Sequence, residues 1–189
     1  MENTYEKLHL QAGKVALDRL THADIELVRR WRNSENVRKY LVFRGEITPE
    51  MQEAWFQKIN NDNNFYFIIS FDGQKIGLQN LKDIDYEKRC GEGGVFLADE
   101  SFLNQGIGFV ASVLLSDFAF GTLKLDYCIA HILNENTRAI RYNKFLGLVL
   151  QPGQENIHNQ LYHHQRNAYF ERRPHLIEML KAANLIPED

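Results

Sequence analysis

A glycine-rich turn at residues 104–109, Asn-Gln-Gly-Ile-Gly-Phe, is the feature that constrains this chain most. A short apolar run precedes it at residues 94–97, and a long apolar stretch follows it at residues 109–120. This order predicts a strand, a tight turn and a helix. Free N–H groups at a helix start attract an anion, and glycine lets the anion approach closely. The turn is therefore a candidate phosphate site, although similar turns also occur as plain connections.

The composition narrows the class of protein. The 189 residues are 44% hydrophobic, which is typical of one globular domain spanning residues 1–189. A net charge of −3 gives no basic footprint for nucleic acid. No apolar run has the length of a membrane span, and residues 1–18 lack the apolar segment of a signal peptide. We therefore expect neither nucleic acid nor membrane as a partner.

The two cysteines, Cys90 and Cys128, do not have the spacing of metal ligands. We therefore expect no metal, and a reduced, cytoplasmic protein. Either thiol could be a nucleophile, although free cysteines more often behave as small buried hydrophobes.

Local signals predict the order of the elements. Thr21 and Asp24 indicate a helix start after a first strand, and Thr48-Pro49 indicates a second helix start. Asp72-Gly73 predicts a hairpin turn. The predicted strands are 14–20, 65–71, 74–81, 90–97, 125–133, 148–150 and 159–170, and the later helices are 109–120 capped by Gly121, 136–147, and 174–184. This order predicts a mixed α/β sheet with helices on its faces.

A second motif, Asn-Thr-Arg-Ala-Ile-Arg-Tyr-Asn-Lys-Phe-Leu-Gly-Leu, occupies residues 136–148. It is similar to the Asn-x-x-Ala-Ile…Lys-x-x-Gly-Phe helix of GNAT acetyltransferases, and the glycine turn resembles that family's phosphate turn. The resemblance covers residues 14–170, which would be the domain core. It implies the GNAT fold, a mostly antiparallel, twisted sheet of about six to seven strands with helices on both faces, splayed between its fourth and fifth strands.

The resemblance implies that acetyl-CoA is the cosubstrate and lies between the strands at 91–97 and 125–133. Amides of the turn would hold the pyrophosphate, and exposed strand backbone would pair with pantetheine and polarise the thioester carbonyl. The residues that this assigns to the cofactor are Val95, Phe96, Leu97, Asn104, Gln105, Gly106, Ile107, Gly108, Phe109, Asn136 and Asn143. Asn136 is equally suited to cap the helix that follows it, and one side chain could do both.

The sequence departs from the family pattern at two positions. Leu103 stands where members often have Arg or Gln, which matters little if backbone amides hold the phosphates. Asn143 stands where many members have a tyrosine that protonates the leaving thiolate, and Tyr142 would be rotated away from that helix face. Asparagine is no general acid, but it can donate a hydrogen bond to sulfur or hold a water. Either Asn143 stabilises the thiolate directly, or the thiolate leaves unprotonated.

Acetyl transfer requires a neutral amine, so a base is expected. The candidates are Glu92 and His131, on the two strands that would flank the cofactor, together with His163 and His164. Because strand neighbours face opposite sides, at most one of the last two points inward. Each candidate also has an ordinary structural alternative, and no carboxylate or cysteine near the histidines completes a metal set.

Residues 31–40, Trp-Arg-Asn-Ser-Glu-Asn-Val-Arg-Lys-Tyr, resemble the GNAT branch that acetylates nucleotide-linked amino sugars and also the ribosomal-protein N-terminal acetyltransferase branch. Trp31 could stack on a sugar or base, and Arg32 and Arg38 could grip a diphosphate. Alternatively, the tryptophan is core and the arginines are solvated. Candidate acceptor residues also include Asn33, His163 and His164, the last two in a basic tail with Arg166, Arg172 and Arg173.

These observations lead to one expected function and two alternatives. We expect direct acetyl transfer, in a ternary complex, to the primary amine of a nucleotide-linked amino sugar. Protein N-terminal acetylation is the first alternative, and a catalytically weak CoA-binding module is the second. A homodimer is compatible with an open sheet that ends in a polar strand.

Overall fold

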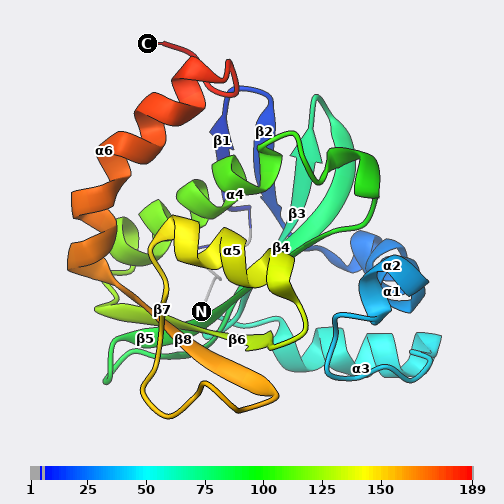
Figure 1. The fold of residues 1–189 in the computed structure, drawn as a ribbon. Coiled ribbons are helices and arrows are strands. Elements are labelled where there is room, and N and C mark those ends of the chain that lie inside the picture. The colour runs from blue at the N-terminus through cyan, green and yellow to red at the C-terminus, as the bar shows by residue number, and fades with distance from the viewer. Residues whose placement is uncertain (1–4, 6, 189) are drawn as a thin grey trace.

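The computed structural model describes residues 5 and 7–188, and they build a mixed sheet with helices around it (Figure 1). The strands are β1 (His9–Ala12), β2 (Val15–Arg19), β3 (Phe65–Phe71), β4 (Gln74–Asp85), β5 (Cys90–Leu97), β6 (Tyr127–Leu133), β7 (Val149–Leu150) and β8 (Asn159–Gln165). The helices are η1 (His22–Asp24), α1 (Ile25–Asn33), α2 (Glu35–Arg38), α3 (Pro49–Ile59), η2 (Glu100–Phe102), α4 (Ile107–Ser116), η3 (Asp117–Thr122), α5 (Thr137–Leu146) and α6 (Arg166–Ala182). The predicted α/β class is confirmed, with eight strands in the described sheet rather than six or seven.

The sheet has the strand order β1-β2-β3-β4-β5-β6-β8-β7, and β5 and β6 form the one parallel pair among the strands that the structure describes. This pair is short, because it runs only from Cys90 opposite Tyr127 to Glu92 opposite Ile129. Beyond Glu92, β5 pairs only with β4, and β6 continues only along β8. The two strands therefore separate, as predicted, and the edge of β5 that faces β6 has no ladder partner beyond Glu92 among the described residues.

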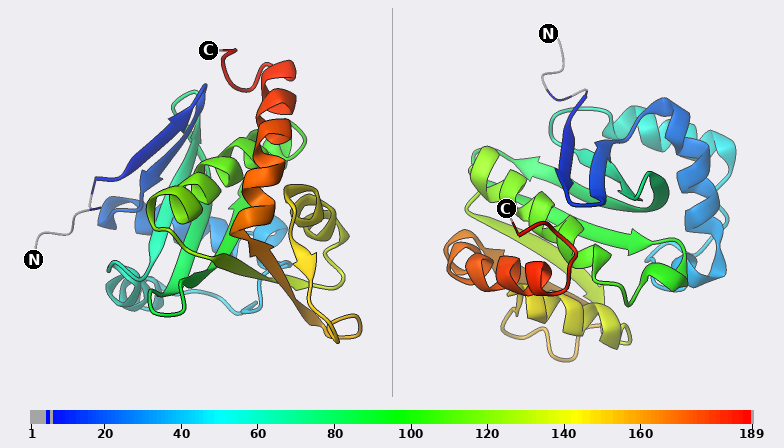
Figure 2. Two further views of the ribbon diagram at one scale, coloured as in Figure 1. Left: turned by 90° about the vertical axis from the view of Figure 1, so that its left-hand side faces the viewer. Right: turned by 90° about the horizontal axis from the view of Figure 1, so that it is seen from above.

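Helices cover both faces of the sheet (Figure 2). The side chains of β3 alternate, so that Phe65 and Phe67 enter the core under α4 and α6, while Tyr66 and Ile68 pack beneath α1 and α3. This period of two is what a strand buried on both faces requires. Each face of the sheet thus carries its own hydrophobic cluster. No helix in the described part of the chain is both long and apolar enough to cross a membrane.

The N-terminal prediction was incomplete. The predicted strand at 14–20 is β2, and β1 precedes it to form a hairpin that turns at Gly13, where φ is +56°. Glycine adopts such a φ at little cost, which suits the tight turn. Strand β1 is only four residues long, and its residues alternate between exposed and half-buried positions. The sequence therefore carries little apolar pattern for this strand.

Three predicted boundaries in the second half were wrong. Gly121 does not cap the helix after the glycine turn, because η3 continues α4 as a π-helix to Thr122. The last predicted strand, 159–170, ends at Gln165, where α6 begins. Pro174 lies inside α6 rather than at its start, on an exposed position that tolerates the missing N–H.

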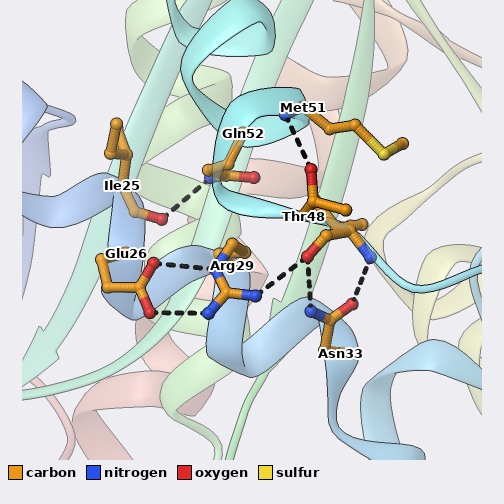
Figure 3. A network of polar contacts seen from close by, with 8 residues as sticks. Ile25, Glu26, Arg29, Asn33, Thr48, Met51 and Gln52 are labelled. Atoms are coloured by element: carbon orange, nitrogen blue, oxygen red, sulfur yellow. Dashed lines mark hydrogen bonds and ion pairs between the residues drawn. The ribbon is translucent and has the colours of Figure 1, made fainter.

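A polar network fixes the segment between α1 and α3 (Figure 3). The carbonyl of Ile47 accepts hydrogen bonds from Arg29 Nη1 and Asn33 Nδ2, both at 2.9 Å, and the Ile47 N–H donates to Asn33 Oδ1. Thr48 caps α3, as predicted, and Gln52 Nε2 donates to the Ile25 carbonyl. The loop that follows α2 is therefore anchored where it enters α3.

Candidate active site

The glycine turn presents three neighbouring amides at the start of α4. The N–H groups of Gly106, Ile107 and Gly108 have no hydrogen-bond acceptor among the described residues. Gly106 adopts φ +77°, a left-handed conformation that turns the chain into the helix. Free amides at a helix N-terminus are the groups that bind a phosphate, so the turn fits the pyrophosphate expected there.

The two glycines of the turn serve different purposes. A Cβ on Gly106 would collide with Leu185, which follows α6 and packs over the turn. A Cβ on Gly108 would lie 3.4 Å from Tyr142 Oη, so Gly108 allows α5 to approach α4. Sequence reasoning assigned both glycines to the phosphate alone. It also missed Arg138, whose Nη2 donates to Asn104 Oδ1 at 3.2 Å and brings a cation beside the turn.

Tyr142 joins α5 to α4. Its hydroxyl donates to the Gly108 carbonyl at 2.6 Å and shares a 2.6 Å hydrogen bond with Ser112 Oγ. Burial raises the pKa of Tyr142 well above its ordinary value. The ring also packs on Phe109, with 4.6 Å between centroids. Tyr142 is thus turned away from the face of Asn143, as the sequence predicted, and has a packing role.

Asn136 and Asn143 share one face of α5, since both bond to the backbone of Ala139. Asn136 Oδ1 accepts from the Ala139 N–H at 3.0 Å, which confirms the N-cap. Asn143 Nδ2 donates to the Ala139 carbonyl at 2.8 Å. The Nδ2 group of Asn136 has no partner among the residues described. Each amide therefore keeps donor capacity for a ligand beside α5.

Glu92 lies where β5 and β6 part, and the structure brings His131 and Lys82 to it. Glu92 Oε1 is 3.3 Å from His131 Nδ1 on β6, and Oε2 is 3.2 Å from Lys82 Nζ on β4. The Glu92 side chain is 22% exposed. Two residues predicted separately from the sequence thus form one cluster. The sequence analysis did not identify Lys82 as a site residue. The signal that could have found it is the register of the β4–β5 hairpin, which pairs Lys82 with Glu92.

Burial of Lys82 acts to lower its pKa, but hydrogen bonds with Asp83 and Glu92 outweigh this and raise it. The ammonium therefore stays charged across the neutral range. It places a permanent positive charge against the Glu92 carboxylate.

The predicted acceptor residues of α1 lie on the same face of the sheet as Glu92, and they differ in how fully their side chains are engaged by other residues. Trp31 packs edge-on against Phe96, with centroids 6.4 Å apart, and is half-buried. The Arg32 guanidinium lies over the Trp55 ring, 5.4 Å from its centroid, and burial lowers its pKa. Both polar groups of the Asn33 side chain form hydrogen bonds with the backbone of Ile47. Asn33 therefore holds the loop between α2 and α3.

The structure separates the two neighbouring histidines. His163 lies opposite Ile129, on the face that carries Glu92, and stacks on Tyr127 with centroids 5.2 Å apart. His164 points to the other face, where it is 5% exposed and packs between Phe120 and Tyr169. His164 is therefore not on the acceptor side, contrary to its predicted role in acceptor binding.

Two arginines of the predicted basic tail are also engaged within the fold. Arg173 forms a bidentate ion pair with Asp117, at 2.6 and 2.8 Å. Arg172 Nε donates to the Phe145 carbonyl at 2.7 Å. These contacts fasten α6 to η3 and to the end of α5, so both side chains have a structural role.

His164 predicts an acid-sensitive fold. Burial lowers its pKa from 6.5 to about 4, so the folded state disfavours its protonation. The unfolded chain binds the proton already below pH 6.5, and stability is therefore full above that pH and falls towards pH 4. We expect a loss of about 3 kcal/mol from this group, seen as a steep drop in urea unfolding free energy. His164→Gln should flatten this dependence, while the matched exchange His163→Gln should keep most of it. Parallel pH profiles for all three proteins would contradict the assignment.

Comparison with known proteins agrees with this geometry. The family model described as "Acetyltransferase (GNAT) domain" matches residues 14–149. The chain is 26% identical over 141 residues to spermidine N(1)-acetyltransferase of Escherichia coli (strain K12), which covers 74% of this chain and 75% of that protein. It is 26% identical over 123 residues to acetyltransferase PseH of Campylobacter jejuni, covering 65% and 74% of the two chains.

Solved structures show the same fold. The apo structure of FdhC, "a nucleotide-linked sugar GNAT", superimposes with a TM-score of 0.77 at 20% identity, over 92% of this chain and 99% of that one. Spermidine N-acetyltransferase from Vibrio cholerae, in complex with CoA and spermine, gives a TM-score of 0.72 at 19% identity, over 83% and 98%.

The chain belongs to the GNAT acetyltransferase family. It is an acetyl-CoA-dependent N-acetyltransferase, as the two sequence motifs predicted. The free amides of the turn and the unpaired edge of β5 fit that cosubstrate, because the first suit a diphosphate and the second suits the amides of pantetheine.

Proposed function

We propose that the enzyme acetylates the primary amine of a nucleotide-linked amino sugar, by direct transfer in a ternary complex. The observation that carries the choice of acceptor is Arg32. Its half-buried guanidinium has no carboxylate partner among the described residues, although it lies on the same side of the sheet as Glu92. A desolvated, unpaired guanidinium is suited to a phosphate.

Arg32 and the cluster at Glu92 lie on the same face of the sheet, with Tyr66 near both. Arg32 and Lys82 both influence the Tyr66 hydroxyl electrostatically, and Lys82 contacts Glu92 in turn. These groups comprise two cations and two carboxylates, and both carboxylates, Glu92 and Asp83, contact Lys82. Arg32 is thus the cation that has no carboxylate partner among the described residues, and this favours an anionic acceptor. Arg38 on α2, which has no ion-pair partner among the described residues, is the second candidate for the diphosphate.

For the cosubstrate, we assign the pyrophosphate to the amides of Gly106, Ile107 and Gly108. The β5 edge from Val95 to Leu97 would pair with pantetheine, and Asn136 Nδ2 would add a donor. Asn143 would donate a hydrogen bond to the departing sulfur without supplying a proton. The remaining turn residues assigned to the cofactor, Asn104, Gln105 and Phe109, shape the turn in this proposal.

A panel of amines tests the acceptor. Thermal shifts are recorded with CoA present for UDP- and dTDP-linked 4-amino sugars, peptide N-termini and spermidine, followed by turnover with acetyl-CoA. We expect selective stabilisation and acetylation of a nucleotide sugar. Robust turnover of peptides or spermidine with none of nucleotide sugars would reject this acceptor.

Arg32→Gln should separate the acceptor classes. Loss of a charge-assisted hydrogen bond costs about 1.5–3 kcal/mol, so KM for a nucleotide amino sugar should rise roughly 10- to 100-fold. KM for acetyl-CoA should not change. Arg30→Gln is the matched control, because Arg30 is a solvent-exposed residue on the same helix. An equal rise in KM for an uncharged amine would show that Arg32 supports the fold and not a phosphate.

A polyamine is the second candidate acceptor. Spermidine acetyltransferases are among the similar proteins, and a cavity of about 730 Å³ beside α2 is lined by Glu35, Asp99 and Glu100, with Lys39 as the one cation in its lining. Carboxylates of this kind suit ammonium groups. The amine panel decides between the two candidates.

We also propose that residues 1–189 act as a single acetyltransferase domain in the cytoplasm, where the free thiols of Cys90 and Cys128 would stay reduced. A homodimer remains part of the proposal, and sedimentation equilibrium tests it.

A further inference from the structure

Three side chains from three adjacent strands meet where the sheet divides: Lys82 on β4, Glu92 on β5 and His131 on β6. We propose that Glu92 and His131 work as one proton-accepting pair, in which His131 Nε2 takes the proton and Glu92 orients the ring, while Lys82 is a positioning residue for Glu92. The proposal rests on the N-acetyltransferase activity and is independent of the acceptor proposed above.

The contacts of Glu92 argue against its acting alone. One carboxylate oxygen faces His131 Nδ1 at 3.3 Å and the other faces Lys82 Nζ at 3.2 Å. Both oxygens are thus engaged, and the side chain is only 22% exposed. A base must lie within hydrogen-bond reach of the proton that it removes. Glu92 offers no unoccupied oxygen for that purpose.

His131 has the free site that Glu92 lacks. Its side chain is 36% exposed, and Nε2 has no partner among the residues that the structure describes. A carboxylate beside Nδ1 favours the tautomer with hydrogen on Nδ1, which leaves the lone pair on Nε2. Hydrolytic catalytic triads use the same arrangement. In them a carboxylate orients the histidine ring through Nδ1–H, and Nε2 transfers the proton.

Lys82 is held in turn from two sides. Its ammonium contacts Glu92 and, at 3.0 Å, Asp83 Oδ2. The antiparallel register places Lys82 directly opposite Glu92, so the contact follows from the sheet itself. Holding Oε2 leaves Oε1 directed at His131. Lys82 therefore acts through Glu92.

The proton and electron balance is as follows. The acceptor ammonium gives one proton to His131 Nε2, and the neutral amine attacks the thioester carbonyl carbon. The C–N bond forms and the C–S bond breaks, with its electron pair leaving on sulfur. The second proton lost from nitrogen neutralises the thiolate to give free CoA, and His131 releases its proton to solvent.

The first test needs no acceptor. Nitrogen-15 NMR of the full-length protein reports which ring nitrogen of His131 carries hydrogen at neutral pH. We expect the Nδ1–H tautomer in the wild type and a mixture of tautomers in Glu92→Gln. Predominance of the Nε2–H tautomer in the wild type would overturn the proposal, whatever the acceptor is.

The second test is a double-mutant cycle with acetyl-CoA and, as probes, a UDP-linked 4-amino sugar and spermidine. His131→Gln should lower kcat about 100-fold or more, with the KM for acetyl-CoA unchanged. Adding Glu92→Gln should cost less than threefold beyond that, because the two residues act as a unit. Additive losses would overturn the pairing.

Lys82 is tested by conservative rescue. Lys82→Met should lower kcat roughly tenfold at constant KM for acetyl-CoA, and Lys82→Arg should restore most of it. Glu87→Gln, at an exposed carboxylate in the turn between β4 and β5, should leave kcat within about twofold of the wild type. Equal effects of Met and Arg at position 82, or wild-type kcat for Lys82→Met, would overturn the positioning role.

Discussion

Gly106→Glu should abolish acetyl-CoA binding. The new carboxylate would lie beside the three free amides of the turn, where the diphosphate is expected. Juxtaposed like charges cost several kcal/mol, which corresponds to a loss of affinity of about 100-fold or more. The residue would also occupy φ +77° and collide with Leu185, so that the turn itself would shift. Isothermal titration calorimetry with acetyl-CoA measures the effect.

Gly73→Glu is a matched control for backbone strain. Gly73 has φ +79°, but a side chain there meets no atom within 4 Å, in the hairpin turn between β3 and β4. It should lose stability and keep its affinity for acetyl-CoA. Gly106→Ala separates charge from crowding, because it retains the strain and the collision and adds no charge. Wild-type affinity in Gly106→Glu would remove the phosphate site from the turn.

Glu92→Gln should lower kcat by about 100-fold while the dissociation constant of acetyl-CoA stays the same. Loss of a group required for proton transfer costs about 100- to 10,000-fold, and the amide replaces the charge against Lys82 and His131. Because we propose that Glu92 serves the acceptor and not the cosubstrate, acetyl-CoA binding should be spared. Single-turnover kinetics with calorimetry separates the two quantities.

Glu87→Gln serves as its control, because Glu87 is an exposed carboxylate in the turn between β4 and β5. It should behave like the wild type in both measurements. Normal turnover in Glu92→Gln would exclude Glu92 from the proton transfer. A parallel loss of acetyl-CoA affinity would mean that Glu92 instead holds the divided sheet together.

Local patterns were sufficient where the physical signal is short in range. The capping box at Thr21 and Asp24, the Thr48 cap and the Asp72-Gly73 hairpin all depend on residues a few positions apart. The glycine turn and the Asn136 cap are of the same kind. Such signals survive without tertiary contacts, because caps and turns are satisfied by neighbouring backbone groups.

Other boundaries could not be predicted because packing overrides propensity. Residues 166–170 follow a polar strand with no cap or glycine, and they become helical because Tyr169 is buried on α4 and η3, where its hydroxyl bonds to Asp117 and the Val113 carbonyl. Gly121 offers a C-cap signal, but the chain continues as a π-helix. Both outcomes depend on contacts with residues far away in sequence.

The sequence by itself determined the class of the enzyme, since the glycine turn and the Asn136 helix are local motifs whose order defines the cosubstrate site. The tertiary structure alone decided which candidates meet. It brings Glu92 into contact with His131 and Lys82, and it places the His164 side chain in the core. The physical reason is register: side chains 10 and 39 residues from Glu92 become neighbours only when three strands align, and a shift of one residue would send each to the opposite face.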